Sequence, residues 1–255
     1  MRASAKLPLA VMSVATVLLA PPAARATDLT MSASYFTVAE GDPDYDKDYA
    51  PNGAYNWGTW TDLVKTQLGP SGLPVYNTNA AAGEPNYVDL NANGELTWWS
   101  PAENSYSSAA GTGTVTLPYA NYSFYPAGHG NDANGFMAAI FRGTLVVPTT
   151  EQVTFTFGAD DDAFLALGNT IISQEEGIHG VTAAPVTTST LAPGSYDLTL
   201  FYTDRHQTGA GLYFSVDTSN VIIGPPVPEP ETWALMAGGL ALLGAVYGRR
   251  KSSAA

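Results

Sequence analysis

The sequence predicts an all-β fold, a β-sandwich or jelly roll, on three observations. Stretches of alternating apolar and polar residues recur along the chain, Gly and Pro interrupt them at short intervals, and helical periodicity is nearly absent. The chain has 255 residues, with 25 Gly and 18 Pro. The folded domain, predicted over residues 27–222, is long enough for a sizeable core, which the chain's 14 Tyr, 9 Phe and 5 Trp can fill.

The first predicted elements are a strand and a short helix. Leu29–Val38 alternates apolar with small polar residues, which predicts a strand. Asp62–Leu68 places Leu63, Val64 and Leu68 on one side of a helical turn, and the Gly and Pro that follow would end it.

The middle of the chain is less regular. Leu96–Trp99 predicts the start of a strand, whereas the Ser, Gly and Ala of Ser105–Thr114 favour a loop. Tyr119–Tyr125 alternates aromatic with small polar residues, and Phe136–Val147 predicts two strands around Arg142-Gly143.

The clearest strand patterns lie in the second half. Val153–Phe157 alternates with period two, as do Tyr196–Tyr202 and Leu212–Val216. Phe164–Ser173 predicts a hairpin, because its central Gly168-Asn169 suits a two-residue turn.

Three consecutive aspartates, Asp160, Asp161 and Asp162, stand between two of these apolar strands. Like charges so close repel one another, and the segment has no basic neighbour. One interpretation is a solvated acidic loop tip. The other is a site for a hard cation, because Ca²⁺ takes six to eight oxygen ligands and neutralises crowded carboxylates. The three aspartates are therefore candidate Ca²⁺ ligands.

A second acidic run has an aspartate at every second position from Asp42 to Asp48. It begins like a helix-loop-helix calcium loop, but Lys47 stands where the glycine is needed and Gly53 where the bidentate glutamate belongs. That motif is rejected, and a flexible acidic loop is preferred.

The charge balance limits the partners. Residues 27–227 hold 21 Asp and Glu against four Lys and Arg, a net formal charge of −17. Such a surface repels phosphate backbones and anionic lipids, so nucleic acid is not an expected partner, whereas divalent cations are favoured. The chain has no Cys, which excludes disulfides and thiolate chemistry.

The N-terminus has the features of a secretory signal peptide over residues 1–26. Arg2 and Lys6 precede an apolar stretch, Leu7–Ala20, and Ala24-Arg25-Ala26 is the small-x-small pattern of a signal-peptidase site. We predict cleavage after Ala26 and export.

The C-terminus has three parts in order. A Pro-rich linker over residues 223–231 contains Pro228-Glu229-Pro230, Thr232–Gly248 carries no charge and is long enough for a helix that spans a bilayer, and Arg249-Arg250-Lys251 follows. The helix and basic tail occupy residues 232–255. This arrangement resembles a PEP-CTERM sorting signal, with Pro228, Glu229, Pro230, Arg249 and Arg250 as its signature. The alternative is a plain single-pass anchor.

The PEP-CTERM resemblance implies a Gram-negative, biofilm-forming bacterium. There an exosortase in the inner membrane would recognise the signal and remove the helix, so the membrane holds the protein only transiently. The protein would then reach the cell surface or the extracellular matrix.

The main domain resembles the fibro-slime domain on three motifs: Phe155–Asp162, Gly177–Gly180 and Phe201–His206. That family is similar to protective-antigen-type β-sandwiches, in some of which a cis-linked Asp-Asp pair binds Ca²⁺ beside a glycan site. By position, the resemblance implies that Asp160 and Asp161 form this pair. A departure is Asp204, which replaces a glutamate of the pattern.

Other candidate residues have two interpretations each. His179, Arg205 and His206 are candidate ligand-binding residues, and the two histidines could also bind a metal. Histidines in such positions more often brace loops, and Arg205 could instead pair with an aspartate of the triple. Tryptophans such as Trp98 and Trp99 could stack on sugar rings or fill the core.

No catalytic motif appears in the sequence: there is no nucleophile elbow, zinc-protease helix or phosphate-cradling loop. We therefore expect a non-enzymatic surface or matrix protein that binds a glycan or exopolysaccharide with the support of Ca²⁺. The alternatives are a purely structural matrix protein or, third, an enzyme acting on polysaccharide. The sequence leaves open which glycan is bound and whether the mature protein is anchored or released.

Overall fold

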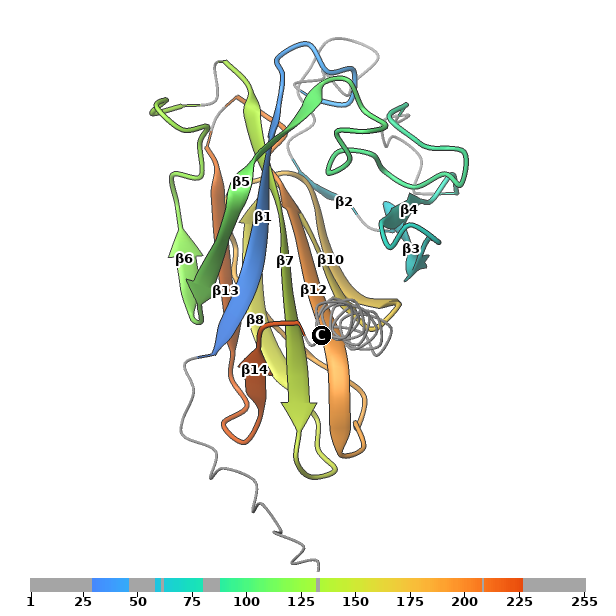
Figure 1. Ribbon diagram of the computed structural model, residues 1–255, viewed down its shortest axis with the longest axis vertical. Coiled ribbons are helices and arrows are strands. Elements are labelled where there is room, and N and C mark those ends of the chain that lie inside the picture. Colours follow the sequence, from blue (N-terminus) through green and yellow to red (C-terminus); the bar gives the residue numbers. More distant parts are fainter. Residues whose placement is uncertain are drawn as a thin grey trace, which may run out of the picture.

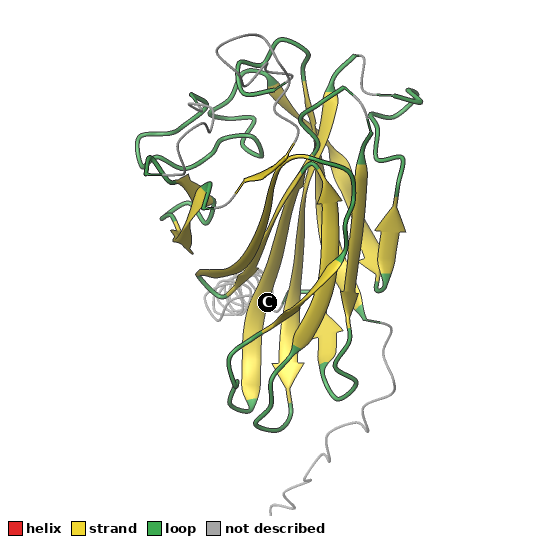
Figure 2. Cartoon of the chain, turned by 180° about the vertical axis from the view of Figure 1, so that it is seen from behind, coloured by secondary structure: helices red, strands yellow, loops and turns green. Residues whose placement is uncertain are grey.

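In the computed structural model the protein is all-β, as predicted, and no helix occurs among the described residues (Figures 1 and 2). The structure describes residues 29–45, 58–60 (backbone only), 62–79, 88–131, 134–207 and 209–226. The predicted signal peptide, the sorting signal, Asp46, Asp48 and Trp57 lie outside these residues. Within them, no helix is long and apolar enough to cross a bilayer.

The described residues form fourteen strands. Their bounds are β1 Thr30–Val38, β2 Gly58–Trp60, β3 Val64–Leu68, β4 Pro74–Tyr76, β5 Ser107–Thr116, β6 Tyr119–Asn121, β7 Phe136–Val147, β8 Thr154–Asp160, β9 Asp162–Leu167, β10 Thr170–Ile178, β11 Ala184–Thr187, β12 Gly194–Thr203, β13 Gly211–Val216 and β14 Ile222–Gly224.

The strands pair into two antiparallel sheets that pack as a sandwich. The large sheet runs β4-β3-β10-β9-β12-β7-β1-β5, with β14 beside β7 and β2 beside β10. The small sheet runs β11-β8-β13-β6. Strands β9 and β10 form the predicted hairpin around Gly168-Asn169, with Leu167 opposite Thr170. Because β8 and β9 follow each other in the chain but lie in different sheets, the aspartates stand where the chain crosses between the layers.

The space between the sheets holds the inner core. Leu165, Leu200 and Phe141 of the large sheet pack here with Phe155 and Phe214 of the small one, all with at most 1% of their surface exposed. The Phe155 and Phe214 rings are stacked, with centroids 5.9 Å apart. The period-two patterns of β8, β12 and β13 belong to this core, which is why they could be recognised from sequence.

An outer core covers the opposite face of the large sheet. Phe164, Phe201 and Ile140 meet Leu63 and Trp98 there, from segments that do not join the small sheet. The central strands β7 and β9 are consequently buried on both faces along most of their length, and such strands show continuous apolar runs rather than alternation. The prediction of two strands over Phe136–Val147 is wrong, because Arg142 and Gly143 continue the pairing with β12 and β7 is one strand.

Two further predictions from composition and spacing are wrong. The predicted helix Asp62–Leu68 is not helical: its residues from Val64 onwards form strand β3, which pairs with β4 and β10. Val64 and the preceding Leu63 are buried in the outer core. The predicted loop Ser105–Thr114 falls largely in β5, which pairs with β1 along its length. Its small residues leave it exposed on both faces, so it lacks the apolar signal of a strand.

The predicted strand start at Leu96–Trp99 is a turn, apart from an isolated bridge at Leu96. Trp98 and Trp99 are buried in the outer core rather than presented to a sugar. The Trp99 indole N–H donates to the Tyr202 carbonyl at 2.8 Å.

The domain boundary predicted at residue 222 falls inside β14. Ile223 and Gly224 pair with Leu145 and Thr144 of β7, and the Ile223 side chain is fully buried. The sandwich therefore extends to Gly224, into the range predicted as linker.

Candidate metal centre where the chain crosses between the sheets

Strand register brings a fourth aspartate to the predicted triple. Strand β8 ends at Asp160, β9 begins at Asp162, and the peptide bond between Asp160 and Asp161 is cis, as the family resemblance implied. Thr203, the last residue of β12, pairs with Asp162. Asp204 is the next residue along the chain, so the register carries it to the side of Asp161.

Carboxylate oxygens of Asp160, Asp161 and Asp204 lie within 4.8 Å of one another. Asp161 and Asp204 are only 1% and 0% exposed, whereas Asp160 is half-buried. Sequence reasoning missed Asp204 as a candidate ligand. Its signal was weak, because nothing local distinguishes an acid at a strand end from an ordinary loop acid.

Asp161 is held by two backbone amides. The His179 N–H donates to its Oδ1 at 3.3 Å and the Arg205 N–H to its Oδ2 at 2.9 Å. Burial raises the pKa of Asp161 well above its usual value, and the charge of Asp162 raises it further, while Arg205 opposes the shift. A negative charge on the Asp161 carboxyl group therefore needs a positive charge nearby to compensate it.

Asp162 stands apart from this cluster, contrary to its prediction as a Ca²⁺ ligand. Its Oδ2 forms a fully buried ion pair with the Arg205 Nε, and its Oδ1 accepts the Gly177 N–H at 2.9 Å. The pairing of Arg205 with an aspartate of the triple was predicted and is confirmed. Asp162 shares a face of β9 with Phe164, so it points into the outer layer rather than toward Asp204.

Both predicted histidines lie beside the cluster. His179 reaches it through its backbone N–H, while its ring Nδ1 lies 3.2 Å from the Gly180 carbonyl oxygen. The His206 N–H lies 3.4 Å from an oxygen of Asp204. These contacts favour bracing over ligation, and a role for either ring in binding stays a prediction.

The second layer around the aspartates is polar and hydrogen-bonded. The Tyr202 hydroxyl donates to the Asp160 carbonyl at 2.9 Å, and Glu175 accepts the Ala159 N–H at 2.7 Å. Burial raises the pKa of Glu175 to about 7, with a smaller contribution from the charge of Asp162. These contacts fix the backbone on which Asp160 and Asp161 stand.

The acidic run at Asp42 is not the flexible loop that the sequence predicted, at least over its described part. Asp42 and Asp44 are 2% and 0% exposed. Asp44 accepts the N–H groups of Val88 and Asp89 and the indole N–H of Trp98, at 2.9 to 3.0 Å. These two aspartates are structural anchors of the outer layer.

The donor set at Asp160, Asp161 and Asp204 fits a hard divalent cation. All three side chains offer carboxylate oxygens, the ligands that Ca²⁺ prefers, and they come from two segments of the chain. Arg205, the cation beside them, directs its Nε to Asp162 instead. A Ca²⁺ bound here would offset the repulsion among buried carboxylates.

The C-terminus matches the PEP-CTERM protein-sorting motif over residues 226–251. This confirms the sorting signal predicted from Pro228, Glu229, Pro230, Arg249 and Arg250. No curated protein has significant sequence similarity to the chain.

Solved structures with some similarity include the PA14 sugar-binding domain from an RTX adhesin, at 12% identity and a TM-score of 0.35, covering 77% of this chain and 95% of that one. The Epithelial Adhesin 9 A domain of Candida glabrata in complex with Galb1-4GlcNAc has 10% identity and a TM-score of 0.35, covering 76% and 86%. A β-glucosidase from Kluyveromyces marxianus has 10% identity and a TM-score of 0.37 over 64% of this chain, which spans only 20% of the enzyme. Membership of the fibro-slime family stays a prediction from sequence.

Proposed function

We propose that this protein is an exported surface or matrix module that binds a glycan or exopolysaccharide through a Ca²⁺ ion. The observation that carries the proposal is the convergence of Asp160, Asp161 and Asp204, two of them almost fully buried. Burying several carboxylates together is costly unless a cation compensates them. The proposed role of this site is binding, not catalysis.

The destination of the protein supports this role. A PEP-CTERM motif implies export and sorting by an exosortase to the surface of a Gram-negative bacterium. At the cell surface such a protein would be in contact with extracellular polysaccharide. The C-terminal helix would hold the protein in the inner membrane only transiently.

Calcium supplies a specific chemistry at such a site. The ion takes six to eight oxygens, more than three carboxylates contribute with one atom each. Asp160, the most exposed of the three, marks the side from which solvent and ligand approach. Sugar hydroxyls are oxygen ligands, so a bound ion could be shared between the protein and a glycan.

The test is Ca²⁺ titration by calorimetry and thermal unfolding of the full-length chain in a detergent without a sugar headgroup. We expect wild type to bind Ca²⁺ and to gain about 2.7 kcal/mol of stability at a Ca²⁺ concentration a hundredfold above its Kd. Asp161→Asn and Asp204→Asn should each weaken binding by about tenfold or more.

Asp162→Asn and Asp197→Asn are the matched controls. Asp162 is an equally buried aspartate outside the cluster, and Asp197 is an exposed one in the middle of β12. Asp197→Asn should keep Ca²⁺ affinity. Asp162→Asn should lose stability and change the affinity less than Asp161→Asn or Asp204→Asn does, because Asp162 acts on the cluster only through its charge. No heat and no thermal shift in wild type would remove the metal from the proposal, and a glycan array with and without chelator tests the ligand.

A purely structural matrix role is the second candidate, and the net charge of −17 over residues 27–227 favours it. In that role divalent ions would bridge acidic surfaces of neighbouring copies. Ca²⁺-dependent self-association measured by light scattering, together with silence on the glycan array, would select this function over glycan binding.

A further inference from the structure

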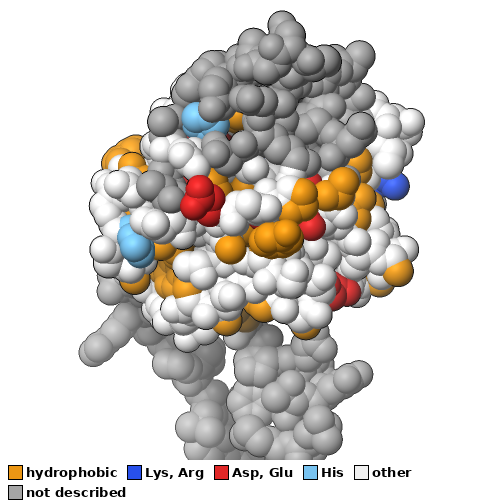
Figure 3. All heavy atoms as spheres, turned by 90° about the horizontal axis from the view of Figure 1, so that it is seen from above, with side chains coloured by type: hydrophobic (Ala, Val, Ile, Leu, Met, Phe, Trp, Pro, Cys, Tyr) orange, Lys and Arg blue, Asp and Glu red, His pale blue; other side chains and the backbone are white. Residues whose placement is uncertain are grey.

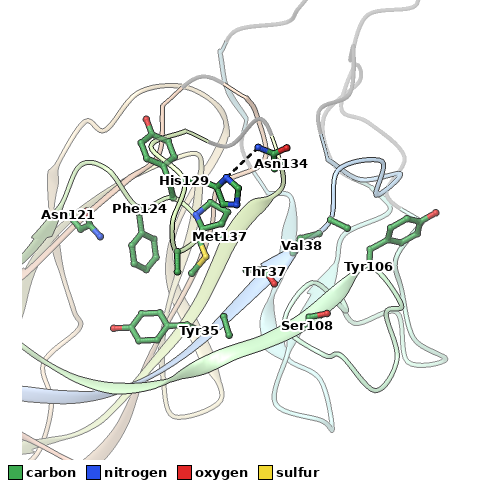
Figure 4. Close-up of a pocket in the computed structure, with 15 residues that line it drawn as sticks. Tyr35, Thr37, Val38, Tyr106, Ser108, Asn121, Phe124, His129, Asn134 and Met137 are labelled. Atoms are coloured by element: carbon green, nitrogen blue, oxygen red, sulfur yellow. Dashed lines mark hydrogen bonds between the residues drawn. The ribbon is translucent and has the colours of Figure 1, made fainter.

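A second feature of the sandwich, away from the aspartates, is an open cleft of about 620 Å³ at the edge of the two sheets. It lies between strands β1 and β5 on one side and residues 121–129 on the other. Figure 4 shows the Tyr35 and Phe124 rings close to each other, with Thr37 and Ser108 further along the strands and His129 on the loop. A volume of this size is typical of small-molecule sites.

The fold itself creates this cleft. The small sheet ends at β6, which has only three residues, and the chain then continues as a loop. No described strand of the small sheet therefore covers the inner face of β1 and β5 near Tyr35 and Ser108. The loop returns over this face instead, and the Phe124 N–H donates to the Ala210 carbonyl at 3.2 Å.

Aromatic carbon forms one wall of the cleft. The Tyr35 and Phe124 rings meet edge to face with centroids 5.9 Å apart, and Phe124 in turn packs on Tyr202 at 4.9 Å. Each of these rings thus packs against the next. Such a surface suits a flat, weakly polar ligand face.

The remaining lining mixes uncharged polar groups with apolar ones such as Val38, Pro126 and Met137. Thr37, Ser108 and Asn121 contribute hydroxyl and amide groups, and Asn134 lies 3.4 Å from the His129 ring. None of the fifteen lining residues is Asp, Glu, Lys or Arg, in a chain with a strong acidic excess. The end-on view in Figure 3 shows few charged side chains among hydrophobic and uncharged ones on the described surface.

This combination of aromatic and uncharged lining groups favours one chemical class of ligand. An ion would find no opposite charge in the cleft, and a wholly apolar ligand would leave its polar groups without partners. A neutral sugar ring has C–H faces that pack on aromatic carbon and hydroxyls that bond to amides and hydroxyls. Anionic sugars would meet the repulsion of the acidic domain.

We propose that the cleft between β1, β5 and residues 121–129 is a binding site for a neutral pyranose, independent of any metal. None of Asp160, Asp161 and Asp204 lines it. The two sites are nonetheless linked, because Phe124 packs on Tyr202, whose hydroxyl donates to the Asp160 carbonyl. The cleft proposal does not rest on the calcium proposal, and either can fail alone.

Adjacent alanines on β5 provide a matched pair of variants. Ala110 lines the cleft. Ala109 is paired with Phe36 of β1, and its side chain lies on the other face of the sheet. Both are exposed, so tryptophan at either position should be tolerated by the fold. Ala110→Trp fills the cleft, and Ala109→Trp adds the same bulk outside it.

The experiment is saturation-transfer NMR on the full-length chain, in excess EDTA and a detergent without a sugar headgroup. The probes are methyl glycosides of glucose, galactose and N-acetylglucosamine and their neutral β-linked disaccharides, with glucuronic acid as the charged comparison. We expect wild type to bind at least one neutral probe, Ala110→Trp to weaken it about tenfold, and Ala109→Trp to leave it within about twofold.

Each possible outcome either supports or overturns the assignment of sugar binding to the cleft. Binding that survives EDTA and is lost only in Ala110→Trp supports the cleft. Binding that disappears with EDTA in wild type belongs to the aspartate site and overturns this proposal, as does the absence of any neutral probe bound. Equal losses in the two tryptophan variants also overturn it. Near-UV circular dichroism of both variants confirms that they are folded.

Discussion

At the scale of single residues, Arg205 joins the candidate metal centre to the rest of the fold. Its backbone N–H donates to Asp161, its Nε pairs with Asp162, and its guanidinium lies 5.2 Å from the Trp98 ring centroid. The side chain is fully buried. A charge buried this deeply depends on its partner, because neither ion can be solvated by water.

We predict that Arg205→Met lowers the free energy of unfolding by about 3–5 kcal/mol, because it leaves the Asp162 carboxylate buried without its cation. The measurement is urea unfolding in the presence of EDTA. The double variant Arg205→Met/Asp162→Asn should be less destabilised than Arg205→Met alone. A single variant within about 1 kcal/mol of wild type would show that the pair contributes little.

At the scale of elements, strand β8 is held close to the segment that leads into β11. A Cβ on Gly158 would lie 2.6 Å from the Ala183 backbone nitrogen and 2.7 Å from its Cα. Both are backbone atoms, so the neighbouring chain itself would have to move. The close approach matters for the site, because β8 ends two residues later at Asp160.

Gly158→Ala should therefore destabilise the domain by about 1–3 kcal/mol, measured as a fall in the urea midpoint. Gly180→Ala is the control, since a Cβ there has nothing within 4 Å. It should stay within about 0.5 kcal/mol of wild type. If both variants behave alike, close packing at β8 is not the cause.

At the scale of the whole molecule, excess negative charge reaches into the interior. Asp89 is half-buried beside the buried Asp42 and Asp44, and its backbone N–H donates to Asp44 at 3.0 Å. Burial raises the pKa of Asp89 to about 8, together with a hydrogen bond to Asp42 and the charges of Asp44 and Asp42. A protonated Asp89 can donate to its acidic neighbours, which an ionised one cannot.

This raised pKa makes stability depend on pH. Below about pH 4 Asp89 is protonated in both states, and its full contribution to stability is present. As the pH rises towards about 8 the unfolded chain has released the proton while the folded domain still holds it, so stability falls. We expect the melting temperature of wild type in EDTA to decrease over this range.

Asp89→Asn should flatten that decrease, because an amide does not titrate. The comparison is Asp197→Asn, at an exposed acid of β12, which should keep the slope of wild type. Melting curves at closely spaced pH values measure both slopes. Parallel curves for wild type and Asp89→Asn would assign the pH dependence to other groups.

The sequence alone determined the fold class, the β9–β10 hairpin and the sorting signal. Each depends on local information: the period of two in Val153–Phe157, the turn at Gly168-Asn169, and the order of the parts from Pro228 onwards. A strand with one buried face shows its geometry in its own sequence. For the same reason the sequence located the three aspartates between two strands, although not that these strands belong to different sheets.

Only the tertiary structure decided which acids meet. The register of β12 against β9 brings Asp204 to Asp160 and Asp161, and the alternation of side chains along β9 sends Asp162 to Arg205 in the outer layer. The same dependence on distant partners made β5 a strand despite its loop-like composition. Pairing between residues tens of positions apart is fixed by the packing of two layers, and no local pattern records it.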